Sequence, residues 1–439
     1  MAWCGHQRRP LTNTNLEEYR LSLDLIVVGL GYVGMPLVSA AVHAGLSVTG
    51  LDVSTRVVEN LNSGKSHIDD LNDGDIADLR QRGFTATNDA SALAEADTIV
   101  VCVPTPLDED SRPNMDAVTS ATESIAQNLQ PGTLVVLEST TYPGTTEELI
   151  QPLLEKSGLK AGQDFHLAFS PERIDPGNAT FGLVNTPKIV GGLTPACTTR
   201  AREFYGRFIE TVVEARGTRE AEMAKLLENT YRHVNIALVN EMAKFCHELG
   251  IDLWDSIRLA ATKPFGFQAF YPGPGVGGHC IPIDPNYLSY NVKSRLGYPF
   301  RFVELAQEIN DSMPMYVASR AQALLNEDRK AINGAKVLML GVTYKPDISD
   351  RRESPAVPLA QNLLSLGADL SYHDPKIDQW TVDGQQINRA TDVMQAAAEA
   401  DLVIVVQNHK VYNLNEIAKT AKRFLDTRGK TTAQGAHLL

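Results

Sequence analysis

A cysteine in a loop rich in glycine and proline is the residue of this sequence best suited to covalent chemistry. Cys280 follows six glycines and prolines in the stretch 272–278, and such a loop lets backbone N–H groups converge on a ligand. Asp284 and Pro285 then resemble the N-cap and first position of a helix over 286–295. Because a thiol near a helix N-terminus ionises more easily, we expect Cys280 to be a nucleophile. Asp284 could equally be only a helix cap.

The five cysteines do not form a pattern typical of disulfides or metal ligands. They are odd in number and widely spaced, and no pair has the Cys-x-x-Cys spacing. We therefore predict a reducing, cytoplasmic location and no metal site. Cys102 and Cys246 are interpreted as small buried hydrophobic residues, the commoner role of a lone cysteine. His279 directly precedes the loop cysteine, so its side chain need not face the thiol.

A lysine and an asparagine on one helix face form a second candidate group. The stretch from Thr218 to Leu249 lacks proline and is amphipathic and alanine-rich, which predicts a long helix. Lys225, Asn229 and Arg232 recur at i, i+4 and i+7, so their side chains share a face. Taken alone, the lysine could be an ordinary solvated residue.

A glycine motif between a strand and a helix predicts a dinucleotide site. The apolar run 23–28 leads into GLGYVG at 29–34, and a helix over 36–44 follows. The next strand, 46–51, ends at Asp52, where a carboxylate would bind the ribose hydroxyls of NAD and repel the 2′-phosphate of NADP. A chance glycine turn between buried elements is the alternative.

Similar strand and helix units occupy both ends of the chain. Further strands are predicted at 97–103, 133–138, 165–169, 336–341, 369–375 and 401–406. The predicted fold is α/β, with two Rossmann-like doubly wound parallel-sheet domains joined by a long central helix and a helical middle domain. In such sheets a ligand binds beyond the carboxyl ends of the strands. The predicted division is a disordered tail (1–20), an NAD-binding domain (21–212), a central helical domain that carries the cysteine loop (213–318) and a second Rossmann-like domain (319–439).

The composition excludes several classes of partner. A chain of 439 residues suits two or three domains. Forty basic and 53 acidic side chains give a net charge of −13, which argues against nucleic acid and anionic membranes as partners. No apolar run approaches the roughly 18–20 residues of a membrane span. Arg8 and Arg9 are not followed by the apolar region of a secretory signal.

Five segments together resemble one protein family. They are GLGYVG, SPER (170–173), EMAKLLENTYR (222–232), GPGVGGHCIPIDP (273–285) and GVTYKPDISDRRESPA (341–356). In order and approximate spacing they are similar to the UDP-glucose/GDP-mannose dehydrogenase family of nucleotide-sugar 6-dehydrogenases, over about residues 23–430. The resemblance implies a four-electron oxidation of a UDP-sugar C6 hydroxyl to a carboxylate with two NAD+, in the supply of uronic acids for a polysaccharide. It also implies a homodimer or higher homo-oligomer built on the central domain, and a last domain that binds the UDP-sugar.

The resemblance also assigns catalytic roles by position. Cys280 would be the nucleophile that captures the aldehyde as a thiohemiacetal and then carries the thioester. Lys225 and Asn229 would stabilise oxyanions during both oxidations. Asp284 would work with the lysine in proton transfer. Glu172 would activate the hydrolytic water, unless it is only an acidic residue in the first turn of a helix.

The remaining implied site residues bind water, cofactor or substrate. Thr140 would help to hold the hydrolytic water. The implied NAD contacts are Gly29, Gly31, Tyr32, Val33, Gly34, Asp52, Thr105 and Arg352. The implied substrate contacts are Lys345, Glu172, Arg173, Lys225 and Gly277. For the arginines near 352, a solvated loop is the alternative.

Departures from the UDP-glucose branch indicate the substrate. Ile283 stands where that branch commonly has a lysine, and the cysteine loop and the Pro176-Gly177 pair are more similar to the branch that oxidises UDP-N-acetylhexosamines. The predicted order is UDP-N-acetylglucosamine, UDP-N-acetylmannosamine and then UDP-glucose. Two other functions remain open. One is a two-electron hydroxyacid dehydrogenase that does not need Cys280, and the other is a non-catalytic nucleotide-sugar-binding protein.

Overall fold

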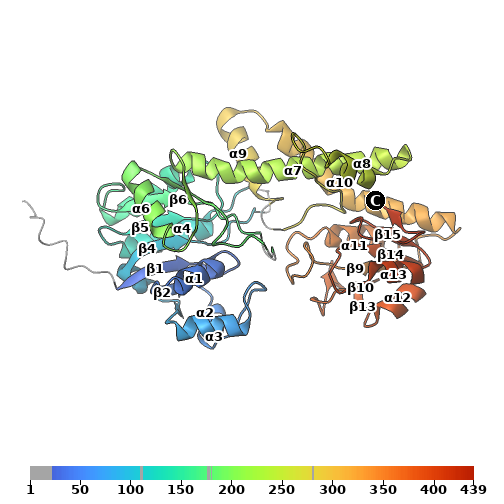
Figure 1. The fold of residues 1–439 in the computed structure, drawn as a ribbon, viewed down its shortest axis with the longest axis horizontal. Helices are drawn as coiled ribbons and strands as arrows, with labels where there is room; N and C mark the ends of the chain where they lie inside the picture. The colour runs from blue at the N-terminus through green and yellow to red at the C-terminus, as the bar shows by residue number, and fades with distance from the viewer. Residues whose placement is uncertain (1–21, 109–111, 176–177, 179, 279–280) are drawn as a thin grey trace, which may run out of the picture.

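Two parallel sheets lie at opposite ends of the molecule and are connected through a region of long helices (Figure 1). The computed structural model describes residues 22–108, 112–175, 178, 180–278 and 281–439. The predicted tail, 1–20, lies outside the described residues. The predicted α/β class with two parallel sheets and a helical middle region is confirmed.

The first sheet has eight strands, in the order β3-β2-β1-β4-β5-β6-β7-β8. Their bounds are β1 Leu23–Val28, β2 Val48–Leu51, β3 Thr85–Thr87, β4 Ala96–Val101, β5 Leu134–Leu137, β6 His166–Phe169, β7 Lys188–Gly192 and β8 Val212–Glu214. Successive strand residues point to opposite faces. Leu25 and Val27 therefore enter one core, and Ile26 and Val28 enter another.

Helices cover both faces of this sheet, which is why its central strands are apolar on both sides. The helices are α1 Gly34–His43, α2 Thr55–Asn62, α3 Asp73–Gln81, α4 Asp116–Asn128, α5 Gln151–Leu154 and α6 Pro195–Tyr205. Buried residues of α1, α2, α3 and α6 share a core with Leu25, and those of α4 and α5 share a core with Ile26.

Two neighbouring strands of the first sheet, β7 and β8, run opposite to the others. β7 pairs antiparallel with β6, and Phe169 and Ala168 lie opposite Gly191 and Gly192. The first residue of β7, Lys188, therefore lies at the edge of the sheet where β5 and β6 end.

Four helices form the middle region: α7 Thr218–Glu248, α8 Leu253–Ala260, α9 Asp284–Leu296 and α10 Arg301–Glu327. The long helix predicted from Thr218 is present as α7, which packs against α9 and α10. α10 is continuous across the boundary predicted between 318 and 319. None of the helices in the described ranges is long and apolar enough to cross a membrane.

The second sheet has six parallel strands, in the order β13-β10-β9-β14-β15-β16. The bounds are β9 Lys336–Leu340, β10 Asp369–His373, β13 Asn388–Arg389, β14 Leu402–Val405, β15 Phe424–Asp426 and β16 His437–Leu438. Helices α11 Ala356–Ser365, α12 Val393–Glu399 and α13 Leu414–Thr420 complete this unit, and β11 Thr381–Val382 and β12 Gln385–Gln386 form a hairpin. As predicted, β9 leads into a glycine turn, since Gly341 has a φ of 78°.

Candidate active site

The glycine motif between β1 and α1 provides space for a diphosphate. Gly29 has a φ of 93°, and a Cβ atom there would lie 2.7 Å from the carbonyl oxygen of Cys102. A Cβ atom on Gly34 would overlap the carbonyl group of Gly29, so the helix can approach the strand only without a side chain. Above Gly31, in contrast, there is open space at the start of α1. A tight turn, close packing and room for phosphate are the three features that a dinucleotide site requires.

The other predicted NAD contacts lie around this turn. The Asp52 carboxylate accepts hydrogen bonds from the N–H groups of Leu30 (2.9 Å) and Ser54 (2.8 Å), so it is fixed at the end of β2. Val33 is the N-cap residue of α1. Thr105 is buried in the loop after β4.

An arginine from the second sheet unit crosses to this turn. The guanidinium carbon of Arg352 lies 5.2 Å from the ring centre of Tyr32, a cation–π contact. Asp350 holds the guanidinium through a contact of 2.6 Å between Nη2 and Oδ2. Ser349 adds a second contact between the two units, because its hydroxyl donates to Asp69 at 2.7 Å. The contacts fit the expectation that Arg352 lies on the cofactor side.

Four of the six predicted catalytic residues are joined in two hydrogen-bonded pairs beyond the strand ends of the first sheet. The Lys225 ammonium on α7 donates to the backbone oxygen of Glu172 at 2.5 Å. One turn further along α7, the Asn229 amide donates to Oδ2 of Asp284, also at 2.5 Å. Thr140, half-buried, follows β5 at the same edge of the sheet. Cys280, the proposed nucleophile, lies outside the described residues, as do His279, Pro176 and Gly177.

Asp284 is not the cap of the helix that it begins. Ile283 is the N-cap residue of α9 and makes no side-chain cap hydrogen bond, whereas Asp284 and Pro285 occupy the first two helical positions. The prediction of Asp284 as N-cap was therefore wrong by one residue. Its carboxylate turns instead towards α7. Burial raises the pKa of Asp284 to about 7, although the Lys225 charge and the Asn229 hydrogen bond lower it. A carboxyl group with such a pKa can exchange a proton near neutral pH.

Both ends of the cysteine loop are fixed to α7. The Asn240 side-chain oxygen accepts the N–H of Gly273 at 2.9 Å, and Asn229 holds Asp284 at the other end. Between them, Gly277 packs so tightly that a Cβ atom would lie 2.6 Å from the backbone oxygen of Glu353. The loop thus bridges α7 and the second sheet unit.

Lys345, the predicted substrate contact in the second sheet unit, lies next to the first unit. Lys345 forms an ion pair of 2.6 Å with Asp175, next to the SPER segment. Arg173 instead pairs with Glu228 of α7 at 2.7 Å. Each of these two cations therefore already has a carboxylate partner in the structure.

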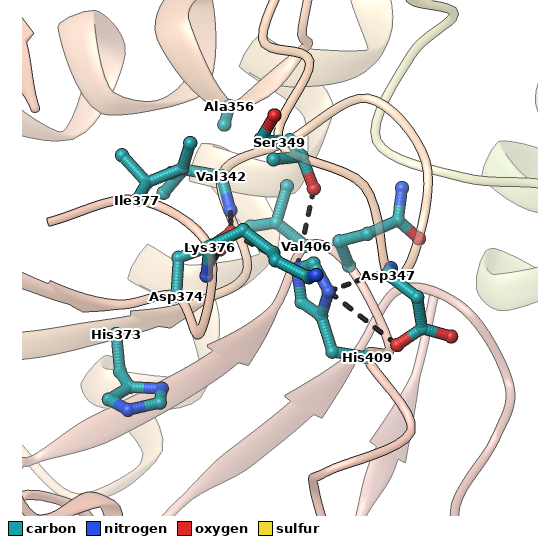
Figure 2. A network of polar contacts seen from close by, with 12 residues as sticks. Val342, Asp347, Ser349, Ala356, His373, Asp374, Lys376, Ile377, Val406 and His409 are labelled. Atoms are coloured by element: carbon teal, nitrogen blue, oxygen red, sulfur yellow. Dashed lines mark hydrogen bonds and ion pairs between the residues drawn. The ribbon is translucent and has the colours of Figure 1, made fainter. Parts of the chain in front are cut away.

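A buried network anchors the loop that carries Lys345 (Figure 2). The ring of His409 accepts the N–H of Asp347 at Nδ1 (2.9 Å) and lies 3.0 Å from Asp374 through Nε2. Asp374 also accepts the N–H of Val342 at 2.7 Å. Because Nδ1 is an acceptor, Nε2 must carry the proton that is donated to Asp374. The network ties both ends of the loop 342–347 to strand ends of the second sheet.

Sequence reasoning missed several charged or polar residues near the site. Lys188 and Glu138 form a buried ion pair of 2.9 Å behind Glu172. The Tyr287 hydroxyl of α9 donates to the backbone oxygen of Pro106 at 3.1 Å. The guanidinium of Arg428 is so close to Gly273 that a Cβ atom there would lie 2.8 Å from Nη1. The run Lys188-Ile189-Val190 resembles the start of a strand, which was the one local signal available. Among the described residues, no group of three or more His, Cys, Asp or Glu could hold a metal ion.

Three family models match successive parts of the chain. They describe the NAD binding domain (residues 23–209), the central domain (219–312) and the UDP binding domain (338–433) of the UDP-glucose/GDP-mannose dehydrogenase family. Together they cover most of the chain, and they confirm both the predicted NAD cofactor and a UDP-binding unit.

Similar proteins include proteins named as nucleotide-sugar dehydrogenases. The UDP-N-acetyl-D-mannosamine dehydrogenase of Yersinia pestis is 35% identical over 92% of this chain and 98% of its own length. The structure of the UDP-D-ManNAc dehydrogenase of Pyrococcus horikoshii is 31% identical, with a TM-score of 0.85 over 95% of this chain and 98% of that one. A UDP-glucose dehydrogenase of Pyrobaculum islandicum is 25% identical, with a TM-score of 0.84 over 96% and 98%. The chain therefore belongs to the UDP-glucose/GDP-mannose dehydrogenase family, and it is an NAD-binding nucleotide-sugar dehydrogenase.

Proposed function

We propose that the protein oxidises C6 of a UDP-N-acetylhexosamine to a carboxylate in two NAD-dependent steps. The observation that carries this proposal is the buried cluster of Lys225, Asn229 and Asp284 beside Glu172, with Cys280 four positions before Asp284. An ammonium, an amide and a carboxyl group of near-neutral pKa are the groups that an alcohol oxidation requires. A cysteine is required only if the reaction continues to the acid level.

Each residue of the cluster has a task in this reaction. Asp284 accepts the C6 hydroxyl proton in the first oxidation, while Lys225 and Asn229 stabilise the oxygen that becomes the aldehyde. The Cys280 thiolate then adds to the aldehyde carbon, and the resulting oxyanion faces the same two donors. When bound, NAD+ supplies the acceptor for the hydride that leaves C6 in each oxidation. Glu172 finally takes a proton from the water that attacks the thioester, and the C–S bond breaks to release the Cys280 thiolate.

The relatives change the order of the candidate substrates. The sequence prediction placed UDP-N-acetylglucosamine first, and that preference stays an untested prediction. The relatives at about 34% identity are named UDP-N-acetyl-D-mannosamine dehydrogenases. We therefore place UDP-N-acetylmannosamine first and UDP-N-acetylglucosamine second. The TM-scores do not separate UDP-glucose from these sugars, because the Pyrobaculum enzyme superposes as well as the Pyrococcus one.

The decisive experiment counts NADH formed per sugar consumed with the three UDP-sugars. We expect two NADH per UDP-N-acetylmannosamine and loss of complete turnover in Cys280→Ser. Cys246→Ala is the matched control, because Cys246 is buried between α7 and α8, away from the cluster. One NADH per sugar would instead indicate a two-electron dehydrogenase. Absence of NADH with all three sugars would favour a binding protein without catalytic activity.

We further propose that the protein is a homodimer formed through α7. Large apolar side chains at 227, 231, 238, 245 and 249 are exposed and recur at intervals of four and seven residues, so they share a face of this helix. Such an exposed apolar face fits a second copy of the chain. Light scattering should give twice the chain mass for the wild type and the chain mass for Leu238→Glu. Met394→Glu, on the exposed side of α12, should remain a dimer. The division into domains at 21–212, 213–318 and 319–439 and the cytoplasmic location stay predictions.

A further inference from the structure

The reversed strand β7 brings a lysine to the edge of the sheet where the active site lies. β7 runs antiparallel to β6, with Phe169 opposite Gly191. Three residues after Phe169 and three residues before Gly191, the same register brings Lys188 opposite Glu172. A parallel strand would have its first residue at the other edge of the sheet. The cation at this position therefore depends on the direction of β7.

Lys188 lies between two carboxylates and is closed off from water. Its side chain is 3% exposed, and Nζ lies 2.9 Å from Oε1 of Glu138 and 3.8 Å from Oε2 of Glu172. The Tyr205 hydroxyl donates to the same oxygen of Glu138. Glu172 uses Oε1 to accept the N–H of Ile174, whereas Oε2 has no hydrogen-bond partner among the described residues.

Other elements also present titratable or charged groups to this cluster. Cys102, after β4, is buried beside it, and burial raises the pKa of its thiol. Lys225 of α7 contacts the Glu172 backbone oxygen rather than its carboxylate. Burial lowers the pKa of Lys188, but Glu138 and Glu172 overcome this effect and raise it, so the ammonium stays charged. Of the cations that contact Glu172 in the described part of the chain, Lys188 is therefore the one that lies closest to its carboxylate.

We propose that Lys188, held in place by Glu138 and Tyr205, is a positioning residue that holds a positive charge beside the Glu172 carboxylate for thioester hydrolysis. The inference rests on the proposed function, because only a thioester requires this step. In hydrolysis the water oxygen bonds to the acyl carbon, a water proton passes to Glu172, and the thiolate of Cys280 leaves. A protonated Glu172 could not accept that proton, so loss of the neighbouring cation slows this step while both oxidations continue.

The test uses two substitutions with opposite expected effects. Lys188→Met leaves Glu172 facing Glu138 without a cation between them. The acid limb of the pH profile of the steady-state rate should therefore move to higher pH by about 1–3 units. Glu138→Gln leaves Lys188 paired with Glu172 alone and should move the acid limb to lower pH. Lys188→Arg retains the charge and should keep the limb of the wild type. At pH 6, Lys188→Met should show a burst of two NADH per subunit, and mass spectrometry of the intact chain should detect the acylated protein.

Matched controls separate this effect from loss of folding. Lys156→Met removes the same side chain from an exposed ion pair with Glu123 and should leave the pH profile unchanged. If Lys188→Met does not fold, the downward shift in Glu138→Gln decides the question alone. If the acid limbs of Lys188→Met and Glu138→Gln move in the same direction, or if neither moves, the proposed role of Lys188 is wrong. A wild type that forms fewer than two NADH per sugar would overturn the proposed function instead.

Discussion

Replacing Asp284 with asparagine should stabilise the protein and inactivate it at the same time. Asp284 is 3% exposed, and among the described residues its carboxylate accepts one hydrogen bond, from the Asn229 amide at 2.5 Å. An asparagine has almost the same shape and can accept this bond through its side-chain oxygen. The substitution therefore removes the charge and the proton-accepting group and leaves the packing unchanged.

The structure gives the size and the pH dependence of the expected gain. Burial raises the pKa of Asp284 from 3.8 to about 7. A raised pKa means that the folded state holds the proton more tightly than the unfolded state. The stability that the protonated carboxyl contributes is therefore complete below pH 3.8 and is lost as the pH rises towards 7. At 1.36 kcal/mol per pH unit the full loss is about 4 kcal/mol, of which about 2–3 kcal/mol falls between pH 5 and pH 8.

Thermal or urea unfolding at pH 5 and pH 8 measures this gain. The free energy of unfolding of Asp284→Asn minus that of the wild type should be about 2–3 kcal/mol larger at pH 8 than at pH 5. Its kcat should fall by about 10²–10⁴-fold, because the proton acceptor is gone. Asp311→Asn, on the exposed side of α10, should show neither effect. An equal stability difference at both pH values would refute the argument that burial governs this carboxyl group, and unchanged kcat would refute its catalytic role.

Three further substitutions test the cofactor site and the anchoring of α7. Asp52→Asn should raise the KM for NAD+ about tenfold and increase the relative rate with NADP+, because it removes the charge that repels a 2′-phosphate. Arg352→Ala should raise the KM for NAD+ about tenfold in steady-state kinetics, because it removes the cation from the Tyr32 ring. Glu222→Ala should lower the free energy of unfolding by about 3 kcal/mol in urea titrations, because the N–H and hydroxyl of Thr146 lose their buried acceptor.

The features of the fold that were predicted correctly are those encoded by neighbouring residues. The glycines at 29, 31 and 34 and the carboxylate at 52 lie within one strand–helix–strand unit, and their arrangement follows from local backbone requirements. The long helix from Thr218 follows from its own periodicity. The segment that contains Cys280 was predicted from its glycines, but the cysteine lies outside the described residues.

The features that were missed depend on contacts between distant residues. Proline is compatible with either of the first two helical positions, so the sequence did not show that Asp284 starts the helix instead of capping it. The direction of β7 is decided by its pairing with β6, and no local pattern reveals that Lys188 begins at the active-site edge. The ion pair of Lys345 with Asp175 likewise joins residues 170 positions apart.

The two attachments of the cysteine loop to α7 make loop and helix a single closed ring. Asn229 and Asn240 are eleven positions apart, which is about 16 Å along the helix axis. The entropy of bringing the ends of the segment 273–284 to this separation is lost when the protein folds, not when the sugar binds. One extra residue in the helix would turn one anchor by about 100° relative to the other. An insertion in α7 between the two anchors would therefore break one attachment, whereas an insertion in an ordinary surface loop leaves the neighbouring elements in place.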